Sequence, residues 1–233
     1  MIVAGLLEFC NTLKPLTDTA DLQERNVWFH DKEGVALKWH YPIGLLYDLH
    51  SKDPITSDSN LPWTIHAKFD SFPTDQLIPF TGTSQQEPSR DQFMATIKQA
   101  DFIRHGSIKN IMGLTKQDQS TLWDAVSSTH DYDAFQSANH SLVQPASTGS
   151  MLPRAIPIRF YRKPSVVIQN LYPPSNSDGT ELTIGETVSN LLNPPSDPQC
   201  ITHGILIDPN TPLSWLSLNA SYPDNFLHIV ILN

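Results

Sequence analysis

Residues 158–170 read IRFYRKPSVVIQN, and this stretch decides the fold class. Two runs typical of strands lie on either side of a proline, which predicts a β-hairpin. After it we expect a helix at Ile184–Leu192, a strand at Ile201–Ile205, a short strand at Leu213–Trp215 and a closing strand at Phe226–Leu232. Hairpin, helix, strand, short strand, short helix and strand is the order of a β-grasp, or ubiquitin-like, domain, in which one helix packs across a mixed sheet.

The start of the chain repeats the later part of this order. Strands are expected at Val27–Phe29, Val35–Trp39 and Trp63–Phe69, with a helical segment at Ile43–Leu49. Two stretches match between the copies, Leu37-Lys38-Trp39 with Leu213-Ser214-Trp215 and Ile65-His66-Ala67 with Leu227-His228-Ile229. The repetition predicts a second unit of the same fold.

The first copy departs from the order at its start. Met1 begins inside a predicted helix, and the apolar side chains that share its face are Val3, Leu6, Cys10 and Leu13. Because no hairpin precedes this helix, we expect the first ubiquitin-like domain to lack its N-terminal hairpin and Trp63–Phe69 to have an unpaired edge. Either the gene model starts late or a partner supplies the missing strands.

The sequence between the copies is helical. Ser89 and Gln92 match a capping box, and Gly106 suits the C′ position of the same helix. A second helix is expected to open at Thr115, with Asp118 in the capping position. The apolar faces of three helices are then Phe93, Ile97 and Ala100; Leu122, Trp123 and Val126; and Phe135, Ala138 and Leu142. A small three-helix unit is the expected structure.

Two segments rich in proline and small polar residues, 72–88 and 144–157, have the composition of linkers. We therefore predict an α+β protein with a first ubiquitin-like domain at residues 1–80, a helix-rich domain at 81–148 and a second ubiquitin-like domain at 153–233.

Composition excludes several function classes. The 233 residues are 39% hydrophobic and 17% charged, and the net charge of −9 disfavours nucleic-acid binding through the whole surface. No apolar run is long enough to span a membrane.

Cys10 and Cys200 match no metal or redox spacing, and the histidines show no metal-ligand spacing, so we expect neither metal nor cofactor. Hydrolase, P-loop and dinucleotide motifs are absent from the sequence, which makes a catalytic enzyme the least favoured class.

Two segments, LKWHYPIGLL at 37–46 and SYPDNFLHI at 221–229, closely resemble the autophagy protein 5 family. Further agreement lies in Leu61-Pro62-Trp63, in Phe69-Asp70-Ser71-Phe72-Pro73, and in Phe93-Met94 followed by Lys98-Gln99-Ala100-Asp101. The resemblance runs from about Val27 to the C-terminus, and it implies two ubiquitin-like domains around a helical one. Members of the family carry an N-terminal helix and a strand pair ahead of the position aligned with Met1.

The resemblance implies a non-catalytic role. It implies that a lysine is joined to the C-terminal glycine of the ubiquitin-like autophagy protein 12, and that autophagy protein 16 binds non-covalently, more weakly here for want of the N-terminal segment. The resulting complex acts like a ubiquitin ligase and promotes transfer of autophagy protein 8 onto phosphatidylethanolamine. The implied location is cytoplasmic, with peripheral association at the preautophagosomal membrane through the complex. The alternative is a ubiquitin-like interaction scaffold that is never conjugated.

Among nine lysines, the family motif selects Lys98 as the covalent attachment site. Helix geometry agrees, because Lys98 lies about 100° around the helix from Ile97 and so points away from the apolar face. The alternative is an ordinary solvated helix lysine.

Basic residues cluster before the last part of the chain, and none follows Lys163. Arg159, Arg162 and Lys163 are candidate contacts for an acidic partner helix. The alternative is that the acidic residues beyond them form a solvated surface. Trp39, Trp63 and Trp215 are expected in the core rather than as interface anchors, and His66 and His228 are expected to share a structural place in the two copies.

Overall fold

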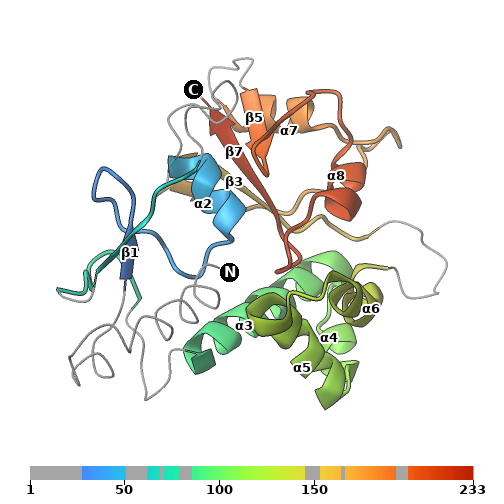
Figure 1. Ribbon diagram of the computed structural model, residues 1–233. Coiled ribbons are helices and arrows are strands. Elements are labelled where there is room, and N and C mark those ends of the chain that lie inside the picture. The colour runs from blue at the N-terminus through green and yellow to red at the C-terminus, as the bar shows by residue number, and fades with distance from the viewer. Residues whose placement is uncertain are drawn as a thin grey trace.

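The computed structural model describes residues 28–50, 62–68, 71–78, 86–144, 153–163, 166–192 and 199–232. Two β-containing units lie side by side, and a helical bundle lies beneath them (Figure 1). The predicted helix at residues 1–14 and the absence of a hairpin before it fall outside the described residues.

The C-terminal unit is a complete β-grasp domain. Its elements are β3 (Ile158–Lys163), β4 (Val166–Ile168), α7 (Ile184–Leu191), β5 (Gln199–Thr202), β6 (Ile205–Ile207), α8 (Leu213–Asn219) and β7 (Leu227–Leu232). The strand order is β4-β3-β7-β5-β6. The central pair, β3 and β7, is parallel with Phe160 opposite Ile229, whereas the other neighbours are antiparallel. The predicted hairpin, helix and mixed sheet are confirmed.

Two predictions inside this unit are wrong. The predicted strand Ile201–Ile205 is a hairpin, because His203 (φ 53°) and Gly204 (φ 74°) form a tight left-handed turn that ends β5 and starts β6. Leu213–Trp215 is the first turn of α8 rather than a short strand. Leu213, Leu216 and Ser217 are buried, which is the spacing of one helix face rather than of a strand.

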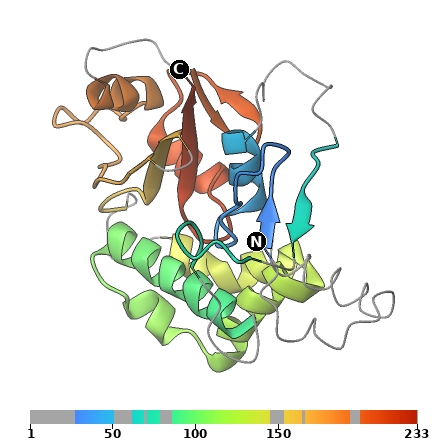
Figure 2. The same cartoon turned by 90° about the vertical axis from the view of Figure 1, so that its left-hand side faces the viewer.

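The five-stranded sheet is covered on both faces. Leucines and isoleucines of α7 and α8 pack on one face, against β-strand residues such as Ile158, Phe160 and Ile229. On the other face, Leu45 and Leu46 of α2 (Ile43–His50) pack with strand residues that include Tyr161, Ile201 and Val230. Figure 2 shows α2 lying against the sheet. The two β-containing units therefore share a hydrophobic core across this second face.

The N-terminal unit, as far as it is described, has fewer strands than the sequence predicts. β1 (Trp28–His30) pairs antiparallel with β2 (His66–Lys68), with Phe29 opposite Ala67. The predicted strand Val35–Trp39 is reduced to one bridge between His30 and Ala36, since the chain turns to enter α2. The predicted helix at Ile43–Leu49 is confirmed as α2.

The residue matches proposed between the two units are wrong. Trp39 is buried in the connection before α2 and its Nε1 donates to the carbonyl of Ile78, whereas Trp215 is 55% exposed on α8. His66 is exposed and stacks on His30, whereas His228 lies on the central strand β7 with its side chain buried. The order of elements repeats, but these side chains do not occupy equivalent places.

The bundle contains α3 (Gln86–His105), α4 (Lys109–Gly113), α5 (Lys116–Asp124), a π-helical turn η4 (Ala125–Thr129) and α6 (Tyr132–Val143). Thr115 and Asp118 form the predicted capping box, and Gly106 ends α3 with φ +73°. The predicted start of the first helix is wrong, since α3 begins at Gln86 and Ser89 is buried inside its first turns. A short fourth helix, α4, joins the three predicted ones, whose apolar faces form the bundle core.

The segment that leads into β3 is packed rather than free. Ala155 and Ile156 are buried, and the Arg154 amide donates to the Arg104 carbonyl at the end of α3 (2.9 Å). The end of the linker predicted at 144–157 is therefore part of the joint between the bundle and the C-terminal unit. None of the described helices combines the length and the hydropathy needed to cross a bilayer.

Candidate functional site

Lys98 is exposed in the middle of α3, the longest helix of the bundle. Ile97 and Ala100, its near neighbours, are fully buried, so the helix presents Lys98 away from the core, as helix-face geometry predicts. Lys109 and Lys116 are also exposed on the bundle. Exposure alone therefore does not single out Lys98. It lies on the helix that packs against the second ubiquitin-like unit through Ala100 and Ile103, about 150° around the axis from them, and its role as the acceptor stays a prediction.

The residue after Lys98 joins α3 to that unit. Arg159 on β3 donates from Nη2 to Gln99 Oε1 (2.6 Å) and from Nε to Gln169 Oε1 (2.8 Å). Its guanidinium lies 3.8 Å from the ring centroid of the buried Phe226. Arg159 is thus held by three groups within the chain.

The residues of the predicted basic cluster lie on β3. The register of β3 against β4 shifts between Tyr161 and Lys163, and this bulge interrupts the alternation of side chains between the two faces of the sheet at Arg162. Arg162 is exposed, and the described side chains do not include that of Lys163. Partner binding by Arg159, Arg162 and Lys163 stays a prediction.

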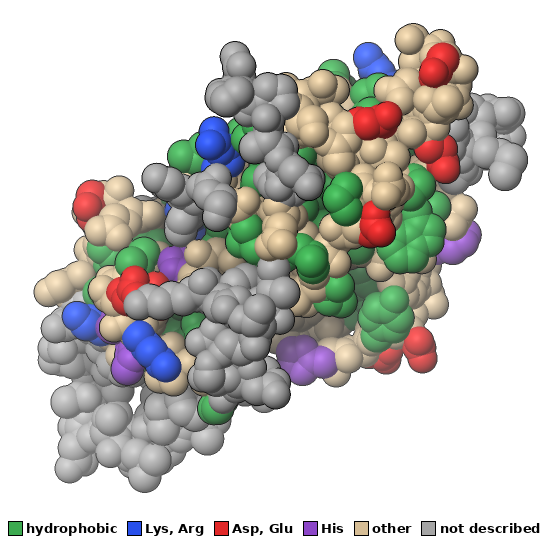
Figure 3. Space-filling model, turned by 90° about the horizontal axis from the view of Figure 1, so that it is seen from above, with side chains coloured by type: hydrophobic (Ala, Val, Ile, Leu, Met, Phe, Trp, Pro, Cys, Tyr) green, Lys and Arg blue, Asp and Glu red, His purple; other side chains and the backbone are tan. Residues whose placement is uncertain are grey.

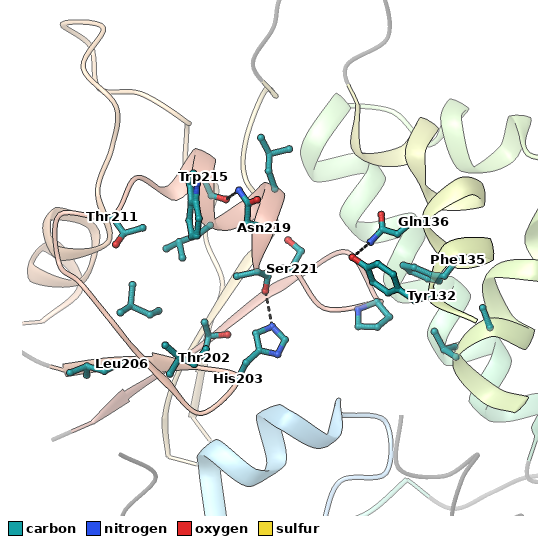
Figure 4. Close-up of a pocket in the computed structure, with 18 of the residues that line it drawn as sticks. Tyr132, Phe135, Gln136, Thr202, His203, Leu206, Thr211, Trp215, Asn219 and Ser221 are labelled. Atoms are coloured by element: carbon teal, nitrogen blue, oxygen red, sulfur yellow. Dashed lines mark hydrogen bonds between the residues drawn. The ribbon is translucent and has the colours of Figure 1, made fainter. Parts of the chain in front are cut away.

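An apolar groove of about 810 Å³ lies between the bundle and the C-terminal unit (Figure 4). We call it the α6–α8 groove. One wall is η4 and α6, with Tyr132 and Phe135; the other is the β5–β6 hairpin and α8, with Leu206 and Trp215. Large apolar side chains that line it are strongly exposed, namely Tyr132 (70%), Ile205 (66%), Trp215 (55%) and Leu218 (60%).

The charged groups that line the groove are acidic. Asp131 and Asp208 are both exposed, and the lining contains no lysine or arginine among the described residues. His203 lies at the floor, stacked on Tyr222 with ring centroids 3.9 Å apart. Burial lowers the pKa of His203, which favours its neutral form. The groove therefore suits an apolar ligand surface with positive charge at its margins.

Sequence reasoning missed this groove. The sequence offered two positions for Trp215, an interface anchor or a core residue, and its match with Trp39 in the repeat favoured the core. The helical spacing of Leu213, Leu216 and Ser217 was the available signal, since it places Trp215 and Leu218 on the opposite, outward side of α8.

The two ubiquitin-like units meet at buried polar groups. The Gly204 amide of the β5–β6 turn donates to Asp48 Oδ1 of α2 (2.8 Å), while Asp48 Oδ2 has no hydrogen-bond partner among the described residues. Burial raises the pKa of Asp48 to about 6. In the adjoining segment, burial and then the charges of Lys38 and Arg159 lower the pKa of His40 to about 4.

Tyr161, His228 and Asp224 form a hydrogen-bonded chain that resembles a catalytic triad, but solvent and substrate cannot reach it. The Tyr161 hydroxyl lies 2.7 Å from His228 Nδ1, and His228 Nε2 lies 2.9 Å from Asp224 Oδ2. Burial would raise the pKa of Asp224, but His228 and the Phe226 amide more than offset it and lower that pKa. Tyr161 and His228 are almost fully buried, so the trio braces the sheet rather than contacting a substrate. Across the described ranges, no three His, Cys, Asp or Glu side chains are grouped to hold a metal ion.

Two ubiquitin-like units packed on a shared sheet face, with a helical bundle beneath, define a multidomain ubiquitin-fold protein rather than a single modifier. Three family models match in this order: "Autophagy protein ATG5, UblA domain" at residues 3–69, "alpha-helical bundle region" at 87–145 and "UblB domain" at 155–231. The chain belongs to the autophagy protein 5 family.

Individual relatives agree with this assignment. Autophagy protein 5 of Phaeosphaeria nodorum is 31% identical over 91% of this chain and 78% of its own length. The Drosophila melanogaster protein of the same name is 32% identical over 91% of this chain and 76% of its own. The crystal structure of Kluyveromyces marxianus Atg5 superposes with a TM-score of 0.71 at 25% identity, covering 89% of this chain and 73% of that one.

Proposed function

We propose that this chain is the non-catalytic acceptor in an autophagy conjugation system, and that Lys98 carries the isopeptide bond to autophagy protein 12. The observation that supports this most directly is an exposed lysine on a rigid helix, next to a residue bonded to the second ubiquitin-like unit. The Lys98 amine attacks the thioester carbonyl that a conjugating enzyme presents. The C–S bond breaks, an amide forms, the thiolate leaves on the enzyme and a base takes the amine proton.

The conjugate acts as a scaffold with autophagy protein 16. Together they promote lipidation of autophagy protein 8 with phosphatidylethanolamine at the preautophagosomal membrane, where this otherwise cytoplasmic chain associates peripherally through the complex. The net charge of −9 agrees with protein partners rather than nucleic acid, and Figure 3 shows acidic side chains scattered among apolar ones on the face seen from above.

The α6–α8 groove is the better candidate for a partner helix than the basic strand. Arg159 is already bonded within the chain, whereas the groove offers exposed Trp215, Leu218 and Tyr132. Aromatic anchors in an apolar groove typically dominate the binding of an amphipathic helix. We therefore assign the non-covalent helix of autophagy protein 16 to this groove.

A lysine substitution tests the acceptor role. Lys98→Arg keeps the charge and helix propensity, so the bundle should melt at the wild-type temperature while the covalent conjugate disappears. Lys109→Arg, an equally exposed lysine of the bundle, is the matched control and should leave the conjugate unchanged. A conjugate that persists in Lys98→Arg contradicts the assignment.

The alternative function is a scaffold that is never conjugated. The groove serves both functions equally, because Lys98 does not line it. The two functions differ in one observable. A conjugate is a higher-mass form that survives boiling in detergent and thiol, whereas a non-covalent complex dissociates.

A further inference from the structure

The joint between α3 and the second ubiquitin-like unit is small. Its apolar part is a cluster of four buried residues, with Ala100 and Ile103 of α3 packed on Ala155 and Phe226. At its edge, the Gln99–Arg159 hydrogen bond is a direct polar contact between α3 and the sheet. Two further links tie the bundle to the same unit: the side-chain amides of Asn139 and Asn225 exchange two buried hydrogen bonds (2.9 and 2.8 Å), and the Arg154 amide donates to the Arg104 carbonyl.

Arg159 is suited to fix that orientation because its own side chain is held on two further sides. The guanidinium stacks on the Phe226 ring at 3.8 Å, and Nε is bonded to Gln169. A planar guanidinium held in this way presents Nη2 in a fixed direction. Gln99 Oε1 accepts a hydrogen bond from Nη2 at 2.6 Å. The position of the Gln99 side chain is therefore set by a residue of the sheet and not by a residue of the bundle.

Fixing Gln99 also fixes Lys98. Consecutive residues on a helix are separated by about 100° around the axis, so any roll of α3 that breaks the Gln99 contact redirects Lys98 relative to β3 and β4. The enzyme that delivers a thioester has to align its carbonyl with the amine within a few tenths of an ångström, and misalignment of about 1 Å costs up to about a hundredfold in rate.

We propose that Arg159 is a positioning residue for Lys98, acting through Gln99. This inference rests on the proposed acceptor function and specifies how the acceptor lysine is presented. It also gives Arg159 a role other than contact with a partner helix.

Three glutamine substitutions test the proposal without removing Arg159 from its stack on Phe226. Gln99→Ala deletes only the contact across the joint, and the rate of enzyme-catalysed conjugation should fall about three- to tenfold, as expected for loss of one solvent-exposed hydrogen bond of ordinary strength. Gln99→Glu replaces the acceptor with a carboxylate and should retain the wild-type rate or exceed it. Gln119→Ala is the matched control, because the Gln119 side chain donates to Leu114 O within the bundle, and it should leave the rate unchanged.

A second measurement separates positioning from loss of structure. A small acylating reagent needs only an exposed amine, so its rate of reaction with Lys98, followed by peptide mass spectrometry, should be the same in Gln99→Ala and wild type. Equal enzymatic rates in Gln99→Ala and wild type, or equal losses with the enzyme and with the reagent, overturn the positioning role. Persistence of the conjugate in Lys98→Arg is a different result, and it overturns the acceptor function itself.

Discussion

Asp48 makes the stability of the folded protein depend on pH. Its side chain is buried between the two ubiquitin-like units. One oxygen accepts from the Gly204 amide, and the other has no hydrogen-bond partner in the part of the chain that the structure describes. His203 and Tyr222 of the C-terminal unit both favour their neutral forms, so neither supplies a positive charge to Asp48. A charged Asp48 is therefore poorly compensated, which is why burial raises its pKa to about 6.

The sign of the pH effect follows. The folded protein binds the Asp48 proton more tightly than the unfolded chain, whose carboxyl keeps a pKa near 3.8. Its stabilising contribution is complete below about pH 4 and is lost as pH rises through about 6. Asp48→Asn removes this dependence, so the melting temperature of wild type relative to the variant should rise as pH falls from neutral to about 4.

The comparison with the variant is necessary because His40 acts in the opposite direction. Its pKa is lowered to about 4, so its contribution is lost as pH falls through that value. His40 is present in both proteins, and its effect cancels in the difference between them. A difference that is constant across the range contradicts the assignment to Asp48.

The positions and contacts of some single residues could be predicted from the sequence, and those of others could not. The outward direction of Lys98 followed from helical periodicity, because one turn of apolar spacing fixes which way its neighbours point. The hydrogen bond between Arg159 and Gln99 was not predictable, because it joins residues that are 60 positions apart in the sequence. No local sequence pattern predicts a contact between residues that far apart.

Among the helices and strands, α8 contributes most to the proposed partner-binding surface. Trp215 and Leu218 project from it into the groove, and neither is needed for the sheet core that Leu213 and Leu216 form. Trp215→Ala should weaken binding of the autophagy protein 16 helix by about tenfold or more, the usual effect of losing an aromatic anchor. Calorimetric titration of a synthetic helix measures it.

Leu171→Ala is the matched control for this substitution. Leu171 is 66% exposed on the same unit but does not line the groove, so its removal should leave the affinity unchanged. Raising the salt concentration should weaken binding modestly, because Asp131 and Asp208 lie at the margins. Equal losses in the two variants would show that the groove is not the binding surface.

Element order was predictable where local signals were strong. The hairpin at β3–β4, the helix α7 and the capping box of α5 each have a short-range cause in the sequence. The identity of Leu213–Trp215 was not predictable in this way, because three residues fit either a strand or a helix turn and tertiary packing decides. The extension of α3 to Gln86 has the same origin, since Pro88 is tolerated in a first helical turn.

For the molecule as a whole, the two sheets should differ in local stability. β7 lies in the middle of five strands and is buried on both faces, so its amides should exchange only on global unfolding. β2 is exposed along its length, and within the described residues it pairs only with β1. Hydrogen exchange followed by mass spectrometry should therefore find β2 exchanging early. Equal protection of β2 and β7 would show that further contacts complete the first sheet.

The shared core of the two ubiquitin-like units was also outside the reach of local patterns. Periodicity indicates that Tyr161 and Val230 are apolar strand positions, but not that α2 of another unit covers them. This packing makes the molecule one scaffold, with Lys98 on the bundle held relative to the C-terminal sheet.

The central claim is that Lys98 is a covalent acceptor on a helix that packs against the second ubiquitin-like unit. The most direct test is to isolate the protein from its own cells under denaturing, reducing conditions, digest it and sequence the peptides by mass spectrometry. The account predicts a branched peptide in which the C-terminal glycine of autophagy protein 12 is joined to Lys98 Nζ. Recovery of the Lys98 peptide only in unmodified form, or of the branch on Lys109 or Lys116, would contradict it.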